Sequence, residues 1–246
     1  MRQVMRTRPW TLPVEPPQLV EIFRRYGREV VYDKGQPLSH GGLTGDVSLL
    51  LEGMVTFSFV DIASKSRIFA LILPGRTIGD LDALNPHSTR VVAECIRPSR
   101  LLVVSNEAYR AALRSSVELM ELYADLAILK EESVLEGAFA NFTMDLDGRL
   151  RALLYSLMCE SPVFRSQPTI EWCACPVDLT VTEIARIVAG NRSWVSTKLS
   201  EWTEEGLVRR VGRVMEIRTS LLSPVYDWLP TRHNVRPDSI LVPTGN

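Results

Sequence analysis

Apolar and polar positions alternate along much of the first half of the chain, in short runs rich in β-forming residues. Gly, Pro, Asn and Asp separate the runs, as expected for strands joined by turns. From Val30 onward the runs read VVYD, VSLLLEG, MVTFSFVD, SRIFALILPG, RVVAECI and RLLVVS. We therefore expect an antiparallel β-roll or barrel in this half.

A helical pattern replaces the alternation between Ser116 and Phe142, where few helix-breaking residues occur. Leucines recur there at steps of three and four, a spacing that suits the seam of a two-stranded coiled coil. A core helix within a single domain is the alternative. The stripe consists of Leu119, Leu122, Leu126 and Leu129, and the less apolar Ser133, Glu136 and Ala140 continue it.

A second helical region begins at Thr180, whose hydroxyl can accept from the backbone while Glu183 reaches back to Thr180, a capping box. Gly190 is expected to adopt the left-handed turn that ends this helix. Asn191 is a good N-cap for a following helix. The apolar stripe of the first helix is Ile184, Ala185, Ile187 and Val188.

The second helix presents two different faces. Val195, Leu199 and Trp202 recur at steps of four and three and form the predicted inward face. The outward face holds short polar side chains and one guanidinium near the helix start, which suits a helix in a major groove. Its residues are Arg192, Ser193, Ser196 and Thr197.

Gly206 is expected to end the second helix, and two short apolar runs, 207–208 and 214–217, can then pair as a hairpin around several arginines. A basic hairpin beside a recognition helix is typical of a winged helix-turn-helix, in which it contacts phosphates. A helical hairpin packed inside some other kind of domain is the alternative. The predicted phosphate contacts are Lys198, Arg209, Arg210 and Arg213.

The segment from Leu179 to Ile217, together with the long helix and the Gly-punctuated half before it, resembles the CRP/FNR (cyclic-AMP receptor and fumarate-nitrate regulator) family of bacterial transcription factors. The resemblance covers about residues 20 to 220. It implies an α+β chain with an N-terminal β-roll of the jelly-roll (double-stranded β-helix) type, a long dimerisation helix and a C-terminal winged helix-turn-helix. The expected boundaries are 1–115, 116–143 and 144–230, followed by a tail over 231–246.

Particular residues match or depart from the family pattern near the DNA-binding domain. Arg192 stands where a base-reading arginine commonly falls, whereas Thr197 replaces a second family arginine, so the operator is expected to differ. Asp145 resembles the cap of the domain's first helix. Gly148 is expected to break the chain at a hinge, before a helix over 150–159.

The stretch from Leu73 to Leu81 resembles the family's entry into its phosphate-binding cassette. In cyclic-nucleotide binders this cassette carries a glutamate for the ribose, which is Asp80 here, and an arginine for the phosphate, which falls at Thr89 beside Arg90. The adenine-contacting pair falls at Val134 and Leu135, both apolar. A one-residue gap would restore Arg90, so an anionic ligand stays open.

These substitutions predict an effector other than cyclic AMP, and an apolar or aromatic small molecule fits best. The resemblance would then extend to the halorespiration regulators, which sense chlorinated phenols. The predicted effector-site residues are Asp80, Leu81, Thr89, Arg90, Val134 and Leu135.

Charge and hydropathy add limits to this interpretation. The formal net charge is −1, and basic and acidic residues are equal in number between Asp178 and Asp227. This balance favours specific, dimer-assisted DNA binding over strong non-specific attraction. No uncharged apolar run reaches transmembrane length and the N-terminus lacks a signal-peptide core, so we expect a cytoplasmic protein with no membrane partner.

Other chemistries find little support in the sequence. His40, His87 and His233 show no paired spacing for a cupin-type metal site, and the first cysteine, Cys95, comes too late for an N-terminal iron-sulfur cluster. Cys173 and Cys175 are interpreted as semi-buried thiols, with a thiol switch that could include Cys159 as the alternative. No catalytic constellation, required cofactor or metal site is expected.

The sequence therefore predicts an effector-responsive regulator that binds an inverted-repeat operator in double-stranded DNA as a homodimer and contacts RNA polymerase. Two alternatives stay open. One is a cyclic-nucleotide-responsive regulator, and the other is a sensor or adaptor that uses the winged helix for protein contacts.

Overall fold

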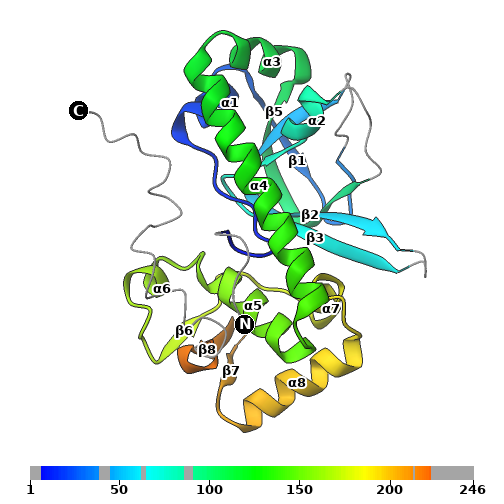
Figure 1. The fold of residues 1–246 in the computed structure, drawn as a ribbon, viewed down its shortest axis with the longest axis vertical. Coiled ribbons are helices and arrows are strands. Elements are labelled where there is room, and N and C mark those ends of the chain that lie inside the picture. Colours follow the sequence, from blue (N-terminus) through cyan, green and yellow to red (C-terminus); the bar gives the residue numbers. More distant parts are fainter. Residues whose placement is uncertain (1–6, 39–44, 62–64, 86–90, 213, 223–246) are drawn as a thin grey trace. The chain divides into compact units, whose positions relative to one another are not determined.

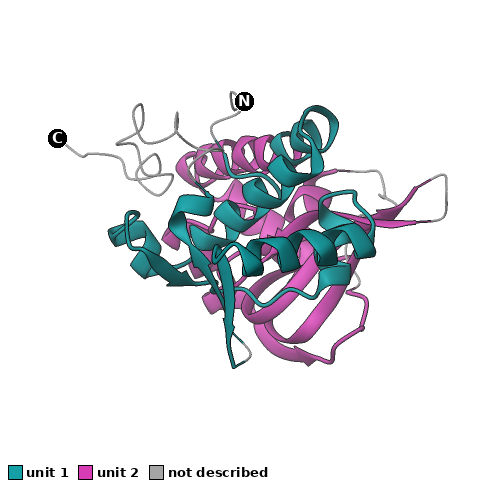
Figure 2. Cartoon of the chain, turned by 90° about the horizontal axis from the view of Figure 1, so that it is seen from below, with its two compact units in different colours: residues 1–10, 135–234 teal, residues 11–134, 235–246 magenta. Residues whose placement is uncertain are grey.

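A computed structural model describes residues 7–38, 45–61, 65–85, 91–212 and 214–222 (Figure 1). The chain divides into two compact units, which are coloured separately in Figure 2. Unit 1 comprises residues 1–10 and 135–234, and unit 2 comprises residues 11–134 and 235–246.

Unit 2 contains an antiparallel sheet with the strand order β1-β5-β2-β3, and β4 also pairs with β2. This confirms the predicted antiparallel roll. The strands are β1 (Arg28–Tyr32), β2 (Asp46–Val60), β3 (Ser66–Ile72), β4 (Thr77–Ile78) and β5 (Val92–Ser105).

Two of these strands are longer than the sequence suggested. β2 runs unbroken through Gly53, where we expected a strand to end, and β5 runs through Pro98. The register of the two strands shifts around Gly53, whose φ is +93°, so the glycine forms a bulge that bends the strand.

Helices flank the strands of unit 2 along the chain. Apolar residues of these helices pack with Val47, Leu49 and Val104 into one core cluster, while a second cluster fills the interior of the roll. The helices are α1 (Pro17–Tyr26), α2 (Asp80–Leu84), α3 (Asn106–Arg114) and the first part of α4 (Val117–Thr143).

The long helix α4 confirms the predicted helix, but the leucine stripe has a different role from the one predicted. Leu126 is fully buried, and Leu119 and Leu122 pack against the core of their own unit. Ser133, Glu136 and Ala140 are buried as well. The stripe therefore packs largely within the protomer, as expected for a core helix, although Leu119, Leu122 and Leu129 are only half-buried.

Unit 1 holds the rest of the chain, including a three-stranded sheet in the order β6-β8-β7. Its first helix begins at Leu146, because the Asp145 carboxylate accepts from the backbone of Gly148 at 2.8 Å. The helix break falls at Met144 and Asp145, within the segment 144–149 predicted as a hinge, but its predicted position at Gly148 is wrong because that residue lies in the first turn of the helix. The elements are α5 (Leu146–Met158), α6 (Pro162–Ser166), β6 (Trp172–Ala174), α7 (Val181–Ile187), α8 (Arg192–Glu204), β7 (Val208–Val211), β8 (Val214–Arg218) and a 3-10 turn, η1 (Thr219–Leu221).

Membrane and metal chemistry find no structural counterpart in the described ranges. No helix there is both long and apolar enough to cross a bilayer. No group of three or more His, Cys, Asp or Glu side chains is arranged to hold a metal ion in that part of the chain. His40, His87, His233 and the predicted tail lie outside the described residues.

Candidate nucleic-acid interface and effector cassette

The first helix of the predicted motif, α7, starts as the sequence indicates. Thr180 Oγ1 accepts from the backbone of Glu183 at 3.2 Å, and Glu183 Oε2 accepts from the backbone of Thr180 at 2.8 Å. Both halves of the capping box are present. Ile184, Ala185 and Ile187 are buried, so the predicted inward stripe is confirmed.

The turn between the two helices differs from the prediction by one residue. Ala189, with φ of +51°, adopts the left-handed conformation, and Gly190 does not. The Gly190 N–H donates to Ala185 O at 3.0 Å, which closes the helix end. A Cβ on Gly190 would lie 3.1 Å from Leu146 Cδ1, so the glycine serves the close packing of α5 here.

The second helix, α8, is capped and oriented as predicted. Asn191 Oδ1 accepts from the backbone of Trp194 at 2.8 Å. Val195 and Trp202 are buried and Leu199 is half-buried, which gives the helix an inward face. Gly206, with φ of +68°, follows the helix, and the Leu207 N–H donates to Trp202 O at 2.8 Å.

The outward face of α8 carries the predicted base-reading residues. Arg192 comes first in the helix and makes no side-chain contact with another residue of the described chain. Ser193 donates to Asn191 Oδ1 at 2.9 Å, so its hydroxyl lies at the cap. All four side chains are exposed: Arg192, Ser193, Ser196 and Thr197.

Two of the side chains predicted to contact phosphates form ion pairs within the protein. Lys198 Nζ lies 2.5 Å from Glu201 Oε2 and 3.9 Å from Asp147 Oδ1. Arg209 donates to Glu216 at 2.6 Å, and its guanidinium carbon lies 4.1 Å from the ring centroid of Trp172. These pairs neutralise charge that the sequence alone assigned to DNA.

The rest of the wing leaves one predicted arginine exposed. β7 and β8 pair antiparallel, with Arg210 opposite Met215. Arg210 is exposed, and no described residue pairs with its guanidinium. Arg213 lies outside the described residues.

The predicted effector residues have different surroundings from one another. Asp80 is 3% exposed and its Oδ2 accepts from Lys130 at 2.7 Å. Val134 packs against the interior cluster of the roll, whereas Leu135 and Leu81 are exposed. Thr89 and Arg90 lie outside the described residues.

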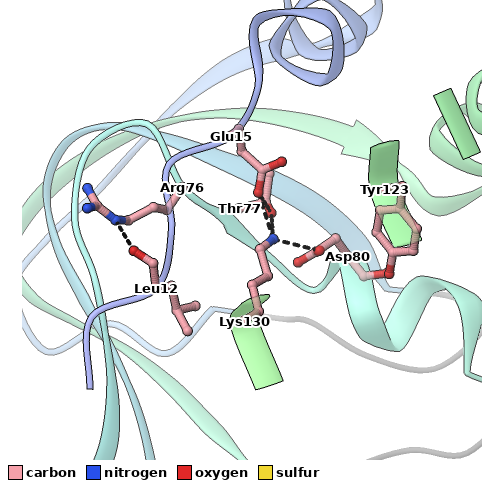
Figure 3. A network of polar contacts seen from close by, with 7 residues as sticks. All are labelled: Leu12, Glu15, Arg76, Thr77, Asp80, Tyr123 and Lys130. Carbon is pink, nitrogen blue, oxygen red and sulfur yellow. Dashed lines mark hydrogen bonds and ion pairs between the residues drawn. The ribbon is translucent and has the colours of Figure 1, made fainter. Parts of the chain in front are cut away.

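The partners of Asp80 could not be identified from the spacing of residues in the sequence. Lys130, Glu15 and Thr77 are all buried and converge on one another near that carboxylate (Figure 3). Lys130 is the only basic residue of α4 and falls between the buried Leu126 and Ser133. A charged residue within a buried stripe was the available signal.

The two cysteines that precede α7 are shielded from solvent. Cys173 and Cys175 are buried, and the Cys175 thiol donates to Val177 O at 3.3 Å. Burial raises the pKa of Cys175 to about 11, so its thiol is protonated at neutral pH. This chemistry disfavours the thiol-switch interpretation at that residue.

Comparisons with known proteins agree with this architecture. No family model matches the chain. The cyclic AMP receptor protein of Thermus thermophilus is 25% identical over 210 residues, which cover 84% of this chain and 91% of that protein.

Two solved structures share the fold. FixK2 from Bradyrhizobium japonicum has a TM-score of 0.66 at 19% identity, covering 81% of this chain and 96% of its own. A transcriptional regulator of the CRP/FNR family, TTHA1359 from Thermus thermophilus, has a TM-score of 0.60 at 20% identity, covering 81% and 98%. In sequence the chain is similar to a cyclic AMP receptor protein, and its fold is the one seen in transcription regulators of the CRP/FNR family.

Proposed function

We propose that this regulator binds an inverted-repeat operator as a homodimer, with α8 of each protomer in a major groove. The observation that carries this proposal is the outward face of α8. It is exposed and polar from Arg192 to Thr197, while the opposite face is buried through Val195 and Trp202. A capped helix with these two faces suits a recognition helix, which reads bases from its first turns.

Base reading and phosphate binding fall to different residues. Arg192 is exposed, comes first in α8 and has no ion-pair or hydrogen-bond partner among the described residues, so we assign it bidentate contact with a base. Ser193, Ser196 and Thr197 supply shorter contacts. Arg210 is the exposed wing residue for phosphate. Lys198 and Arg209 can add phosphate contacts only by leaving Glu201 and Glu216.

A second stripe on α4 supports the homodimer. Large apolar side chains are exposed at Ile128, Leu135 and Phe142, with exposed fractions of 56%, 38% and 87%. These positions are seven residues apart in one helix, and seven-residue spacing keeps side chains on one coiled-coil seam. Exposure of such residues is costly for a monomer, and burial against a second copy removes the cost.

The effector is proposed to be a small molecule other than cyclic AMP. The Asp80 carboxylate, which the resemblance assigns to a ribose, is already bound by Lys130. The exposed Leu81 beside it would favour an apolar ligand, and a cyclic nucleotide is the alternative. Contact with RNA polymerase would follow from promoter binding. No catalytic activity is proposed.

Selection from a random pool of double-stranded DNA tests this function. The full-length protein should enrich an inverted repeat whose half-sites are about one DNA turn apart. Cyclic AMP, cyclic GMP and chlorinated phenols, added in parallel, identify a ligand that changes the enrichment. An adaptor that uses the winged helix for protein contacts would enrich no repeat, and this result would overturn the proposal.

Two arginine variants then separate base reading from phosphate contact. Arg192→Ala should lose about 1–3 kcal/mol of discrimination between the selected site and a mutated half-site. Arg210→Ala, the matched control, should weaken binding to both DNAs equally and reduce the salt slope by about one. Undiminished discrimination by Arg192→Ala would show that α8 does not read the bases as assigned.

A further inference from the structure

Four polar side chains form a buried cluster inside unit 2 (Figure 3). Each comes from a different segment: Glu15 precedes α1, Thr77 lies in β4, Asp80 begins α2, and Lys130 lies in the middle of α4. Lys130 is 2% exposed and Glu15 is 4% exposed. Buried charges of this kind are retained only when they are paired.

Every hydrogen-bond donor of the Lys130 ammonium has an acceptor in this cluster. Lys130 Nζ donates to Thr77 Oγ1 at 2.5 Å, to Glu15 Oε1 at 2.6 Å and to Asp80 Oδ2 at 2.7 Å. An ammonium has three N–H donors, so these contacts use its full capacity. The Thr77 hydroxyl in turn donates to Glu15 Oε1, which closes the network.

The cluster joins three segments that are far apart in sequence. Lys130 connects α4 to the start of α2 through Asp80, and Tyr123, about two turns earlier in α4, donates to the Asp80 backbone carbonyl at 3.1 Å. Lys130 also connects α4 to the segment before α1 through Glu15. Arg76 holds the same segment by donating to Leu12 O at 2.7 Å.

The charges show why the contact is strong. Burial lowers the pKa of Lys130, but the charges of Asp80 and Glu15 more than offset this, so its pKa is raised and it stays an ammonium. Charge-assisted hydrogen bonds in a buried site are stronger than those between neutral groups. Opening the cluster would leave at least one charge buried without a partner.

We propose that Lys130 is an internal latch that fixes α4 to the α2 turn and to the N-terminal segment. This proposal rests on the proposed operator binding, and it specifies what orders α4 for that binding. An ordered α4 is required because the two recognition helices of a dimer must keep one spacing on the DNA. Because the latch fixes α4 before DNA binds, less conformational freedom is lost on binding, and operator affinity therefore depends on Lys130.

Three variants of the full chain test the latch. Lys130→Met removes the ammonium and leaves two acidic side chains buried. The triple variant Glu15→Gln, Asp80→Asn, Lys130→Met removes the ammonium and both carboxylates while nearly keeping their volumes. Lys34→Met is the matched control, because Lys34 is exposed and takes no part in the cluster.

Operator affinity is the first measurement, made by fluorescence anisotropy on the selected DNA without added ligand. We expect the triple variant, at a melting temperature close to that of the natural chain, to bind the operator roughly tenfold more weakly. Lys34→Met should bind as the natural chain does. If the triple variant binds equally well or more tightly, the cluster only supports the fold and the latch is overturned.

Backbone amide exchange of the ligand-free protein is the second measurement and does not depend on DNA. We expect slow exchange over α2, residues Asp80–Leu84, in the natural chain and at least tenfold faster exchange in the triple variant. Unchanged exchange would overturn the latch. If the natural chain enriches no operator, the proposed function fails, while the exchange experiment still decides whether Lys130 holds α2.

Discussion

The guanidinium of Arg209 stacks on the indole of Trp172, with 4.1 Å between the guanidinium carbon and the ring centroid. Arg218 lies 5.8 Å from the same centroid. Each arginine is also paired with a carboxylate, Arg209 with Glu216 and Arg218 with Glu171. The base of the wing is therefore a set of neutralised cations packed on one aromatic ring, which stabilises the hairpin.

Releasing Arg209 from its carboxylate should increase its contribution to DNA binding. Glu216→Gln removes the charge that holds Arg209 Nη2 at 2.6 Å. Non-specific DNA binding should become tighter, and the slope of log affinity against log salt should steepen by about 0.9, as expected for one more phosphate contact.

A second substitution that removes one negative charge serves as the control for the release of Arg209. Glu204→Gln removes an exposed carboxylate of α8 that pairs with no cation among the described residues, so it frees no guanidinium. Its salt slope should equal that of the natural chain. An equal slope for Glu216→Gln would mean that Arg209 stays on Trp172 when DNA binds.

The dimer seam gives a prediction about assembly. Phe142 is 87% exposed in α4, so Phe142→Ser should weaken dimerisation by at least tenfold while the melting temperature of the monomer stays the same. Sedimentation velocity over a range of concentrations measures the dissociation constant. Val163→Ser serves as the control, because Val163 is 50% exposed but lies in α6. A loss confined to Val163→Ser would place the interface on another face.

The buried carboxyl of Glu15 makes the stability of the folded protein depend on pH. Burial raises the pKa of Glu15 from its ordinary value of 4.5, and the nearby charge of Asp80 adds to this, while Lys130 opposes it. Burial also raises the pKa values of Tyr109 and Tyr123 nearby, so both phenols stay neutral. A raised carboxyl pKa contributes stability below the unfolded value, and this contribution is lost as pH rises through the folded value.

In Glu15→Gln the folded protein does not lose this stability as the pH rises, because the amide cannot ionise. The melting temperature of the variant, minus that of the natural chain, should therefore increase as the pH rises above about 4.5, the ordinary pKa of a glutamate. For Glu52→Gln the same difference should instead decrease as the pH rises toward about 4.5 and change little above it, because the hydrogen bond from Arg100 lowers the pKa of Glu52. Parallel curves for the two variants would contradict the assignment of a raised pKa to Glu15.

The buried thiol of Cys175 should be unreactive in the folded protein. With a pKa of about 11, only about one molecule in ten thousand carries the thiolate at pH 7. Iodoacetamide at neutral pH should label Cys175 slowly in the native protein and rapidly in guanidinium chloride, as followed by mass spectrometry. Rapid native labelling, or a Cys173–Cys175 disulfide that changes operator affinity, would restore the thiol-switch interpretation.

Local signals made the helix-turn-helix readable from the sequence. The capping box joins Thr180 to Glu183 and the next cap joins Asn191 to Trp194, so each contact spans three residues and depends on no other part of the fold. The turn between them was not readable to the residue. Ala189 takes the left-handed conformation at a cost of about 1 kcal/mol, because Gly190 is needed against Leu146.

Tertiary contacts account for the other errors. The leucine stripe of α4 matched a coiled-coil seam, but the same spacing packs a helix on its own sheet, and only the structure distinguishes the two. Lys198 and Arg209 were assigned to phosphates because their carboxylate partners stand three and seven residues away, in positions that the sequence did not connect. The Lys130 cluster joins residues up to 115 positions apart.

The bulge at Gly53 has a consequence for how this protein tolerates change. A Cβ at this position would lie 2.3 Å from Pro98 O and 2.4 Å from Ser99 Oγ, where β2 and β5 pass closest. Any side chain would force apart the two longest strands, and φ of +93° is strained for every residue except glycine. A random library spanning the whole chain would thus return glycine alone here, so that one of its most invariant positions would mark the pairing of two strands and not a site of recognition.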